Sequence, residues 1–298
     1  MLNEIRSNVT IIEVGPRDGL QNESVILETE IKYNYIKLLL ESGLKNIEVS
    51  SFVRPEKIPQ MQDCSELSMK LADRKNENLI YLVPNLKGLS LALNNKVKSI
   101  AVFTATSETF NKKNINATIE ESINRITPVI ADAKSKNIYI RGYLSTVFGC
   151  PYEGKSSDET LLNLCKFLID SGVNEISLGD TIGAATPLQV KHIVNLIKNN
   201  FDLSKFAFHF HDTKGMAVAN VLTAFECGAS RFDSSSGGLG GCPYADGATG
   251  NVATEDLIYL FDSMGVQTGI DINKLVKASR YILQNLKKES TSKYFNSL

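Results

Sequence analysis

Residues 161–180 read LLNLCKFLIDSGVNEISLGD, and this stretch contains the unit from which the fold is predicted. Apolar residues recur at helical spacing up to Ile169, Gly172 follows, and a short strand-like run begins almost at once. Glycine is favoured just past a helix because it takes the left-handed backbone conformation without strain. The stretch therefore predicts a helix joined directly to a strand, with Asp180 at the end of that strand.

The same helix ending recurs twice more along the chain. Glu-Ser-Gly ends one helical pattern at Gly43 and Glu-Cys-Gly ends another at Gly228, and a predicted strand follows each. Eight strand candidates alternate with helical segments, over residues 9–14, 45–50, 79–84, 99–104, 138–145, 174–179, 206–211 and 230–235. Eight strand–helix units within about 250 residues are typical of a (β/α)8 TIM barrel, an α/β fold.

An open, doubly wound sheet is the alternative fold. Its nucleotide-binding form carries a G-x-G-x-x-G turn after the first strand, whereas the first strand here leads into GPRDG at residues 15–19. No low-complexity linker or break in composition divides the chain. We therefore predict a single domain over 1–298, with the barrel over about 9–265 and a C-terminal helix with a polar, frayed tail over 266–298.

Composition excludes several classes of partner. The 298 residues carry a formal net charge of −1, so we expect neither nucleic acid nor an anionic membrane surface as a partner. No apolar run approaches the roughly 20 residues that span a bilayer, and the first ten residues lack the basic and apolar regions of a signal peptide. The five cysteines have no paired spacing. Reduced thiols and a cytoplasmic location are therefore expected.

Polar side chains follow or end most of the predicted strands. The carboxyl ends of the strands in a TIM barrel meet at one mouth, where the chemistry takes place. Charged groups that converge there need either each other or a ligand, because burying an unpaired charge is costly. The candidates at this mouth are Arg17, Asp18, Glu48, Arg141, Asp180, His209, His211, Cys242 and Asn251.

The stretch FHFHD at residues 208–212 is the sharpest local signal. His209 and His211 are two residues apart on a predicted strand, so both point to one face. Two imidazoles with oxygen donors favour Mg²⁺ or Mn²⁺; a hydrogen-bonded core histidine beside a chance neighbour is the alternative. We nominate Asp18 and Asn251 as oxygen donors, although composition alone does not choose Asp18 over Asp180 or Glu48.

Arg17, Glu48 and Cys242 each have two interpretations. Arg17 either forms a salt bridge with Asp18 that closes the barrel mouth or stabilises a developing enolate or alkoxide. Glu48 either pairs with Arg17 or acts in catalysis. Cys242 lies in GGLGGCPYADGATGN, residues 237–251. It is either an inert small hydrophobe or, in a loop with little core to pack in, a mobile acid or base or an oxidation-sensitive thiol.

Several motifs together resemble the 3-hydroxy-3-methylglutaryl-CoA lyase family, nearly collinearly from about Val9 to Leu260, within a wider superfamily of TIM-barrel carbon–carbon lyases and condensing enzymes. They are VGPRDGLQNE, IEVSSFV with IPQM, VFTATSETFNKKNIN, RGYLSTVFGCPYEGK, SLGDTIG, HFHDTKG and GLGGCPYADGATGNVATED. The resemblance implies cleavage of the acyl-CoA substrate to acetoacetate and acetyl-CoA by a divalent-metal-dependent retro-Claisen reaction, in a homodimer.

The resemblance also implies a role for each matching residue. Asp18, His209, His211 and Asn251 match the metal ligands. Arg17 matches the arginine that stabilises the enolate, and Cys242 matches a loop thiol that takes part in proton transfer. Glu48 and Asp180 match acidic residues of the site, whereas Arg141 and the segment Lys112, Lys113 and Asn114 match the region that handles the acyl-CoA. Asp246 departs from the family pattern, because we expect Gln or Pro at that position.

Two alternatives to this function stay open on sequence alone. A related acyl-CoA lyase or a 2-oxoacid condensing enzyme of the same superfamily would use the same metal site, although the condensing enzymes usually carry additional C-terminal sequence. A non-catalytic scaffold would need neither the metal nor Arg17. Asp18, His209 and Cys242 all stay candidates for the base that removes the first proton.

Overall fold

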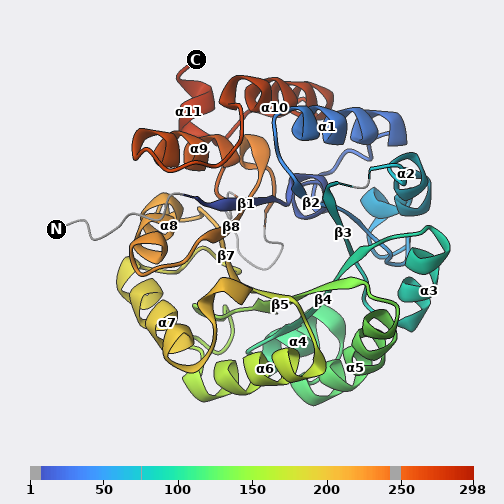
Figure 1. Cartoon of the computed structure of the whole chain (residues 1–298), viewed down its shortest axis with the longest axis vertical. Coiled ribbons are helices and arrows are strands. Elements are labelled where there is room, and N and C mark those ends of the chain that lie inside the picture. The colour runs from blue at the N-terminus through green and yellow to red at the C-terminus, as the bar shows by residue number, and fades with distance from the viewer. Residues whose placement is uncertain (1–7, 75, 242–249) are drawn as a thin grey trace.

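The strands form one closed barrel in the computed structural model, which describes residues 8–74, 76–241 and 250–298 (Figure 1). Each strand pairs in parallel with the next, and β8 pairs back with β1, so the sheet has no open edge. The strands are β1 (Thr10–Glu13), β2 (Asn46–Ser51), β3 (Asn78–Leu82), β4 (Ser99–Ala105), β5 (Tyr139–Ser145), β6 (Glu175–Asp180), β7 (Phe206–Phe210) and β8 (Arg231–Ser234). The predicted TIM barrel is confirmed, and the doubly wound alternative is wrong because its sheet would stay open.

Helices surround the barrel as an outer ring (Figure 1). They are α1 (Thr29–Glu41), α2 (Cys64–Lys70), α3 (Leu86–Asn94), α4 (Glu108–Ile115), α5 (Ile119–Ser135), α6 (Asp158–Ser171), α7 (Pro187–Asn200), α8 (Ala217–Glu226), α9 (Thr254–Ser263), α10 (Ile272–Leu286) and α11 (Lys293–Asn296). Among the described helices, none combines the length and apolar character that a bilayer crossing requires.

The three glycine helix endings adopt the predicted conformation. Gly43, Gly172 and Gly228 have φ values of 104°, 100° and 107°. Gly43 also permits a close approach, since a Cβ there would lie 2.3 Å from the carbonyl oxygen of Gly269. These glycines turn each helix end into the following strand and so keep the connections short.

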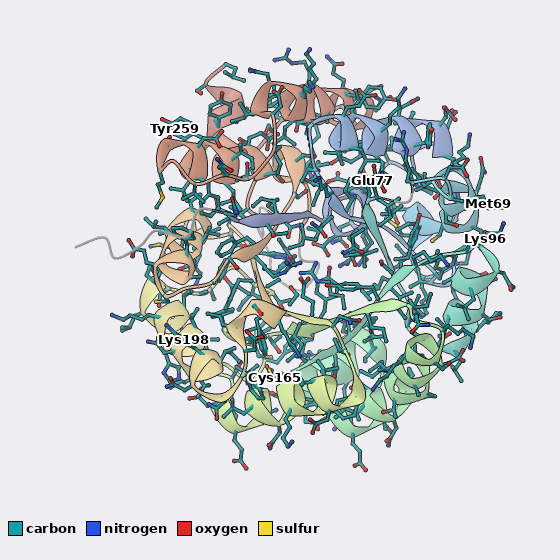
Figure 2. All side chains as sticks on the ribbon, viewed as in Figure 1. Met69, Glu77, Lys96, Cys165, Lys198 and Tyr259 are labelled. Carbon is teal, nitrogen blue, oxygen red and sulfur yellow. The ribbon has the colours of Figure 1, made fainter. Side chains whose placement is uncertain are left out.

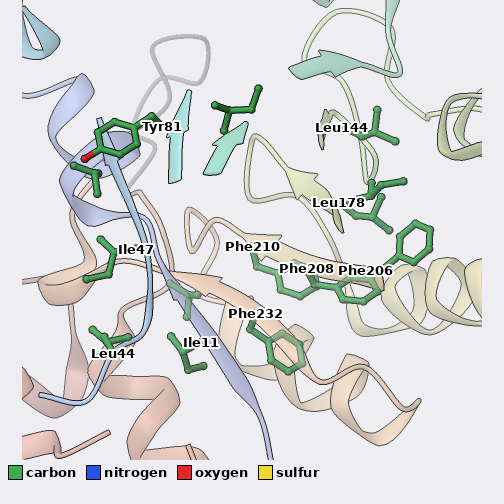
Figure 3. Close-up of a cluster of buried hydrophobic side chains, with 14 of the residues drawn as sticks. Ile11, Leu44, Ile47, Tyr81, Leu144, Leu178, Phe206, Phe208, Phe210 and Phe232 are labelled. Atoms are coloured by element: carbon green, nitrogen blue, oxygen red, sulfur yellow. The ribbon is translucent and has the colours of Figure 1, made fainter. Parts of the chain in front are cut away.

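Alternation along the strands divides the core into two layers. Phe206, Phe208 and Phe210 of β7 point outward into the layer between sheet and helices, where Phe232 of β8 joins them (Figure 3). Ala207, between them, belongs to the smaller cluster inside the barrel. Side chains occupy both the inside of the barrel and the layer between its strands and the helices (Figure 2). The period of two therefore sends His209 into the barrel.

The C-terminal segment differs from the expected helix and frayed tail. It forms two helices, α10 and α11, and α10 lies beside α1 (Figure 1). Between these helices Ser290 and Ser292 are buried, with 8% and 0% of their surface exposed. The polar tail packs because its serines find hydrogen-bond partners, which cancels the cost of burying them.

Candidate active site at the carboxyl end of the barrel

Arg17 and Asp18 lie in a single tight turn, η1 (Gly15–Gly19), that directly follows β1. The carbonyl of Val14 accepts hydrogen bonds from the backbone N–H groups of Arg17 and Asp18, at 3.2 and 2.8 Å. A Cβ on Gly15 would lie 2.5 Å from a carboxylate oxygen of Glu13. The glycine and the tight turn together explain why the GPRDG sequence places both polar side chains at the barrel mouth.

The predicted metal ligands come together at this mouth. Asp18, His209 and His211 each offer one donor atom, and these atoms lie within 4.8 Å of one another. The Nε2 atoms of the two histidines are 3.1 Å apart. Two ligands at right angles, each about 2.1 Å from an ion, would be about 3.0 Å apart. The observed spacing therefore suits two neighbouring ligands of one divalent ion.

Asn251 completes the donor set. Its Nδ2 donates hydrogen bonds to Asp18 Oδ2 at 2.8 Å and to the carbonyl of Leu239 at 3.1 Å. Its Oδ1 is buried and has no hydrogen-bond partner among the described residues. A buried, unpartnered oxygen is costly unless a ligand satisfies it. Two imidazoles, a carboxylate and this amide oxygen fit Mg²⁺ or Mn²⁺.

The charges of the site set the protonation states of two of the ligands, Asp18 and His211. Burial would raise the pKa of Asp18, but the positive charge of Arg17, followed by the histidines, outweighs it and lowers that pKa to about 2. Burial lowers the pKa of His211 to about 4, and the charge of His209 acts in the same direction. Asp18 is thus an anion and His211 a neutral imidazole at neutral pH, which are the forms that bind metals.

His209 is oriented from below by Asp233 of β8. Its Nδ1 lies 3.1 Å from Asp233 Oδ2, and this contact leaves Nε2 facing His211. Burial lowers the pKa of His209, but the hydrogen bond and charge of Asp233 outweigh that effect and raise it. Sequence reasoning missed Asp233. Its signal was an inward-facing position on the eighth predicted strand, next to the strand that carries the histidines.

Arg141 lies deeper than its expected place beside an acyl-CoA. It is 0% exposed, and it forms ion pairs with Asp233 at 2.5 Å and with Glu175 at 3.0 Å. A side chain with no exposed surface has no atom to offer a ligand at the mouth in this structure. Its position instead supports Asp233, and through Asp233 it supports His209.

Arg17 forms the predicted salt bridge with Asp18, and its second predicted role, stabilising a developing enolate, stays a prediction. Its guanidinium contacts Asp18 Oδ1 at 2.8 Å and Glu48 Oε2 at 2.6 Å, and lies over the ring of Tyr143. Glu48 therefore pairs with Arg17, as one of its two interpretations required. Burial raises the pKa of Glu48, although the charge of Arg17 opposes this. The guanidinium of Arg17 keeps its positive charge next to the predicted metal ligands.

Asp180 and the residues of α4 are not members of the donor cluster formed by Asp18, His209 and His211. The carboxylate of Asp180 accepts hydrogen bonds from the backbone N–H groups of Ala184 and Ala185, at 2.9 and 3.0 Å. It therefore shapes the loop after β6. Lys113 and Asn114 are exposed on α4, which directly follows β4, so they lie at the rim of the same face, as does Lys112. The ammonium group of Lys113 lies 3.9 Å from the centre of the Tyr152 ring.

The described parts of the glycine-rich segment, residues 237–241 and 250–251, lie beside the cluster. The side chain of Asn22 donates to the carbonyl of Gly241 at 2.8 Å, and the backbone N–H of Asp212 donates to the carbonyl of Gly250 at 2.9 Å. Cys242 and Asp246 lie outside the described residues. Their predicted roles therefore stay predictions.

Two buried carboxylates hold the backbone where the glycine-rich segment begins. Glu13 accepts a hydrogen bond from the backbone N–H of Ser236 at 2.8 Å, and Glu255 accepts one from that of Gly237 at 3.0 Å. Burial raises the pKa of each carboxyl to about 7, even though these hydrogen bonds act in the opposite direction. Both groups therefore change charge near neutral pH.

This shift predicts a pH dependence of stability. Between about pH 4.5 and 7 the folded state keeps a proton on Glu255 that the unfolded state releases, so stability falls as the pH rises through this window. We expect Glu255→Gln to reduce the difference in unfolding free energy between pH 5 and pH 8 by at most about 3 kcal/mol. Denaturant titrations of the metal-free protein at both values measure it.

Glu226→Gln is the matched control, because Glu226 is exposed at the end of α8. It should leave the pH dependence unchanged. Equal pH dependence in Glu255→Gln and in the parent protein would show that Glu255 titrates as it does in an unfolded chain.

Comparisons with known proteins agree with the resemblance seen in the sequence. Residues 8–282 match the family model described as HMGL-like. The chain is 45% identical to the human mitochondrial hydroxymethylglutaryl-CoA lyase over 98% of its own length and 90% of that protein. The crystal structure of the Bacillus subtilis HMG-CoA lyase superposes with a TM-score of 0.96 at 43% identity, covering 99% of each chain.

A further solved structure contains a bound ligand. It is an HMG-CoA lyase from Acinetobacter baumannii in complex with coenzyme A and 3-methylmalate. Its TM-score is 0.92 at 36% identity, and the match covers 98% of this chain and 95% of that one.

Proposed function

Because the chain belongs to the HMGL-like family, we propose that it cleaves 3-hydroxy-3-methylglutaryl-CoA to acetoacetate and acetyl-CoA. It is then a carbon–carbon lyase. The observation that carries the proposal is the cluster of Asp18, His209 and His211 beside the unpartnered amide oxygen of Asn251, with Arg17 next to it. Relatives named as HMG-CoA lyases, one of them complexed with coenzyme A, support the same substrate class.

Asp18, His209, His211 and Asn251 would hold a divalent ion, Mg²⁺ or Mn²⁺, which polarises substrate oxygens and acidifies a hydroxyl. The neighbouring contacts orient two of these ligands. Asp233 fixes His209 through its Nδ1 atom, and the hydrogen bond to Asp18 helps to aim the amide oxygen of Asn251 at the site.

Arg17 supplies a fixed positive charge where the departing acetyl-CoA develops its enolate. Its guanidinium stays charged at any physiological pH, and its contacts with Asp18 and Glu48 hold it in place before the substrate arrives. A charge placed in advance stabilises the transition state without the cost of reorganising water. When a base takes the tertiary hydroxyl proton, the carbon–carbon bond breaks and the hydroxyl carbon becomes the ketone of acetoacetate. The bonding electrons pass to the acetyl-CoA enolate, which takes up a proton to give acetyl-CoA.

The first proton acceptor stays a choice among Asp18, His209 and Cys242. Of the two candidates that the structure describes, Asp18 and His209, Asp18 is the weaker base, because its pKa lies at about 2. His209 is also a predicted ligand, with Nδ1 engaged by Asp233 and Nε2 facing the site, so all three residues stay candidates for the acceptor.

Four further parts of the proposal concern assembly, pathway and location. Homodimeric assembly, leucine degradation and ketone-body formation rest on the family resemblance. A cytoplasmic location rests on the cysteines without paired spacing, and the four that the structure describes form no disulfide.

The test is an assay of acetoacetate release from 3-hydroxy-3-methylglutaryl-CoA with Mg²⁺, with Mn²⁺ and after chelation. We expect turnover within the ordinary range of about 1–10³ s⁻¹, its loss on chelation, and its return when metal is restored. Metal binding without cleavage would show that the substrate is a different compound, and 2-oxoacids and related acyl-CoAs would be tested next. A purified protein that binds neither ion would overturn the site itself.

A further inference from the structure

The segment between α10 and α11, residues 288–292, crosses the start of the glycine-rich segment. We call it the strap. Ser290 Oγ donates a hydrogen bond to the carbonyl of Gly237 at 3.0 Å, and the backbone N–H of Thr291 donates to the same carbonyl at 3.1 Å. Thr291 Oγ1 donates to the carbonyl of Gly238 at 3.2 Å. Three donors of the strap thus converge on two neighbouring peptide groups.

The strap fits tightly over these glycines. Gly237 and Gly238 have φ values of 69° and 68°, in the left-handed region that favours glycine. A Cβ on Gly238 would lie 1.9 Å from Thr291 Oγ1, so any larger residue would displace the strap. The N–H of Gly237 is held by Glu255 on the opposite side. Both backbone polar groups of Gly237 are therefore fixed.

The strap is itself anchored at both ends. Lys288 forms an ion pair with Glu23 at 2.5 Å, in the loop that follows Arg17 and Asp18. Ser292 Oγ donates to Asp256 at the start of α9, at 2.7 Å. The strap thus joins the β1–α1 loop, the start of the glycine-rich segment and α9.

The peptide that follows the clamped glycines reaches the metal ligands. The carbonyl of Leu239, which is 1% exposed, accepts a hydrogen bond from Asn251 Nδ2. The other hydrogen of that Nδ2 goes to Asp18 Oδ2. A flipped amide would place its oxygen against these two acceptors, so Leu239 and Asp18 together decide that Oδ1 faces the site.

We propose that Ser290 and Thr291 are positioning residues, which hold Gly237 and Gly238 so that the Leu239 carbonyl orients Asn251 toward the divalent cation. The inference rests on the metal site of the proposed function. It predicts that the strap controls metal affinity from outside the site, since neither side chain is among the four predicted ligands. Partners that orient metal ligands change affinity by about 10–100-fold when they are removed.

The test compares Mn²⁺ dissociation constants, measured by titration calorimetry, for the parent protein and for the double variant Ser290→Ala with Thr291→Val. Valine keeps the shape of threonine and removes only the Oγ1 donor. We expect Mn²⁺ binding to weaken by about tenfold. Activity should be lost at low Mn²⁺ and return at saturating Mn²⁺, with KM for the acyl-CoA unchanged. Thr291→Ser, which keeps the donor, should bind Mn²⁺ more tightly than Thr291→Val.

Two controls separate positioning from general loss of structure. Ser297→Ala removes a hydroxyl in the same tail whose partner is Tyr294, and it should leave the dissociation constant unchanged. In an Asn251→Ala background the double strap variant should cause no further loss, because the coupling runs through Asn251. Equal Mn²⁺ affinity of the parent and strap variants would overturn the inference alone, whereas absence of Mn²⁺ binding by the parent would overturn the proposed function.

Discussion

Arg17→Gln should lower kcat for cleavage of 3-hydroxy-3-methylglutaryl-CoA by about 10³-fold, the upper range for losing one group that stabilises an oxyanion. Arg17 holds its positive charge between Asp18 and Glu48, next to the predicted ligands. Mn²⁺ affinity should not fall, because the substitution removes a cation that repels the metal. Steady-state kinetics and Mn²⁺ titration on the same preparation measure the two effects separately.

Removal of Arg17 also leaves Glu48 buried without its partner, which destabilises the fold. Glu48→Gln in the same chain removes that charge. The double variant should regain thermal stability and keep the kinetic defect. Arg17→Lys keeps the charge without the planar fork, so its kcat should lie between those of the parent and Arg17→Gln. A parallel fall in kcat and in Mn²⁺ affinity would show that Arg17 serves the metal site rather than the enolate.

The fold could be predicted from sequence because its signals are local. A period of two along 206–211 separates Phe208 and Phe210 from His209, and the structure places them in different layers. Gly172 marks the end of α6 by its left-handed conformation, which few other residues adopt without strain. Patterns of this kind depend on neighbours in the chain, so one sequence suffices to see them.

The division of labour among the acidic residues could not be predicted in the same way. Asp18 follows a strand, Asp180 ends one and Glu48 lies within one, and only the packing of the whole barrel decides their partners. Asp180 meets two backbone N–H groups of its own loop, and Glu48 meets Arg17, whereas Asp18 meets the histidines. These differences depend on contacts between elements distant in sequence.

The height of a residue along the barrel could not be predicted from the sequence either. Arg141 is an inward-facing strand residue like His209, but it pairs in register with Glu175, the first residue of β6. It therefore lies toward the amino ends of the strands. The alternation of a strand tells which face a residue occupies, while the stagger between strands sets its height. Asp233 was missed for the same reason, because its link to His209 requires the register of β7 and β8.

The second large effect that we expect is the loss of metal binding when His209, which pairs in register with Asp233, is replaced. His209→Ala should weaken Mn²⁺ binding by more than about 100-fold, beyond the range for a residue that only orients a ligand. The substitution removes one imidazole donor and leaves His211 without its neighbour at 3.1 Å. Turnover should vanish at Mn²⁺ concentrations that saturate the parent. Calorimetry of Mn²⁺ binding is the primary measurement, so the result does not depend on the substrate assay.

Asp233→Asn should give a graded result between the parent and His209→Ala. It keeps the shape of the side chain but removes the charge that holds His209 Nδ1, so Mn²⁺ should bind about 10–100-fold more weakly. His192→Ala is the matched control, because His192 is exposed on α7 and contacts Asp158 rather than the cluster. It should bind Mn²⁺ like the parent. If His209→Ala also bound Mn²⁺ like the parent, the ion would have to lie elsewhere, and the geometry of Asp18, His209 and His211 would need another explanation.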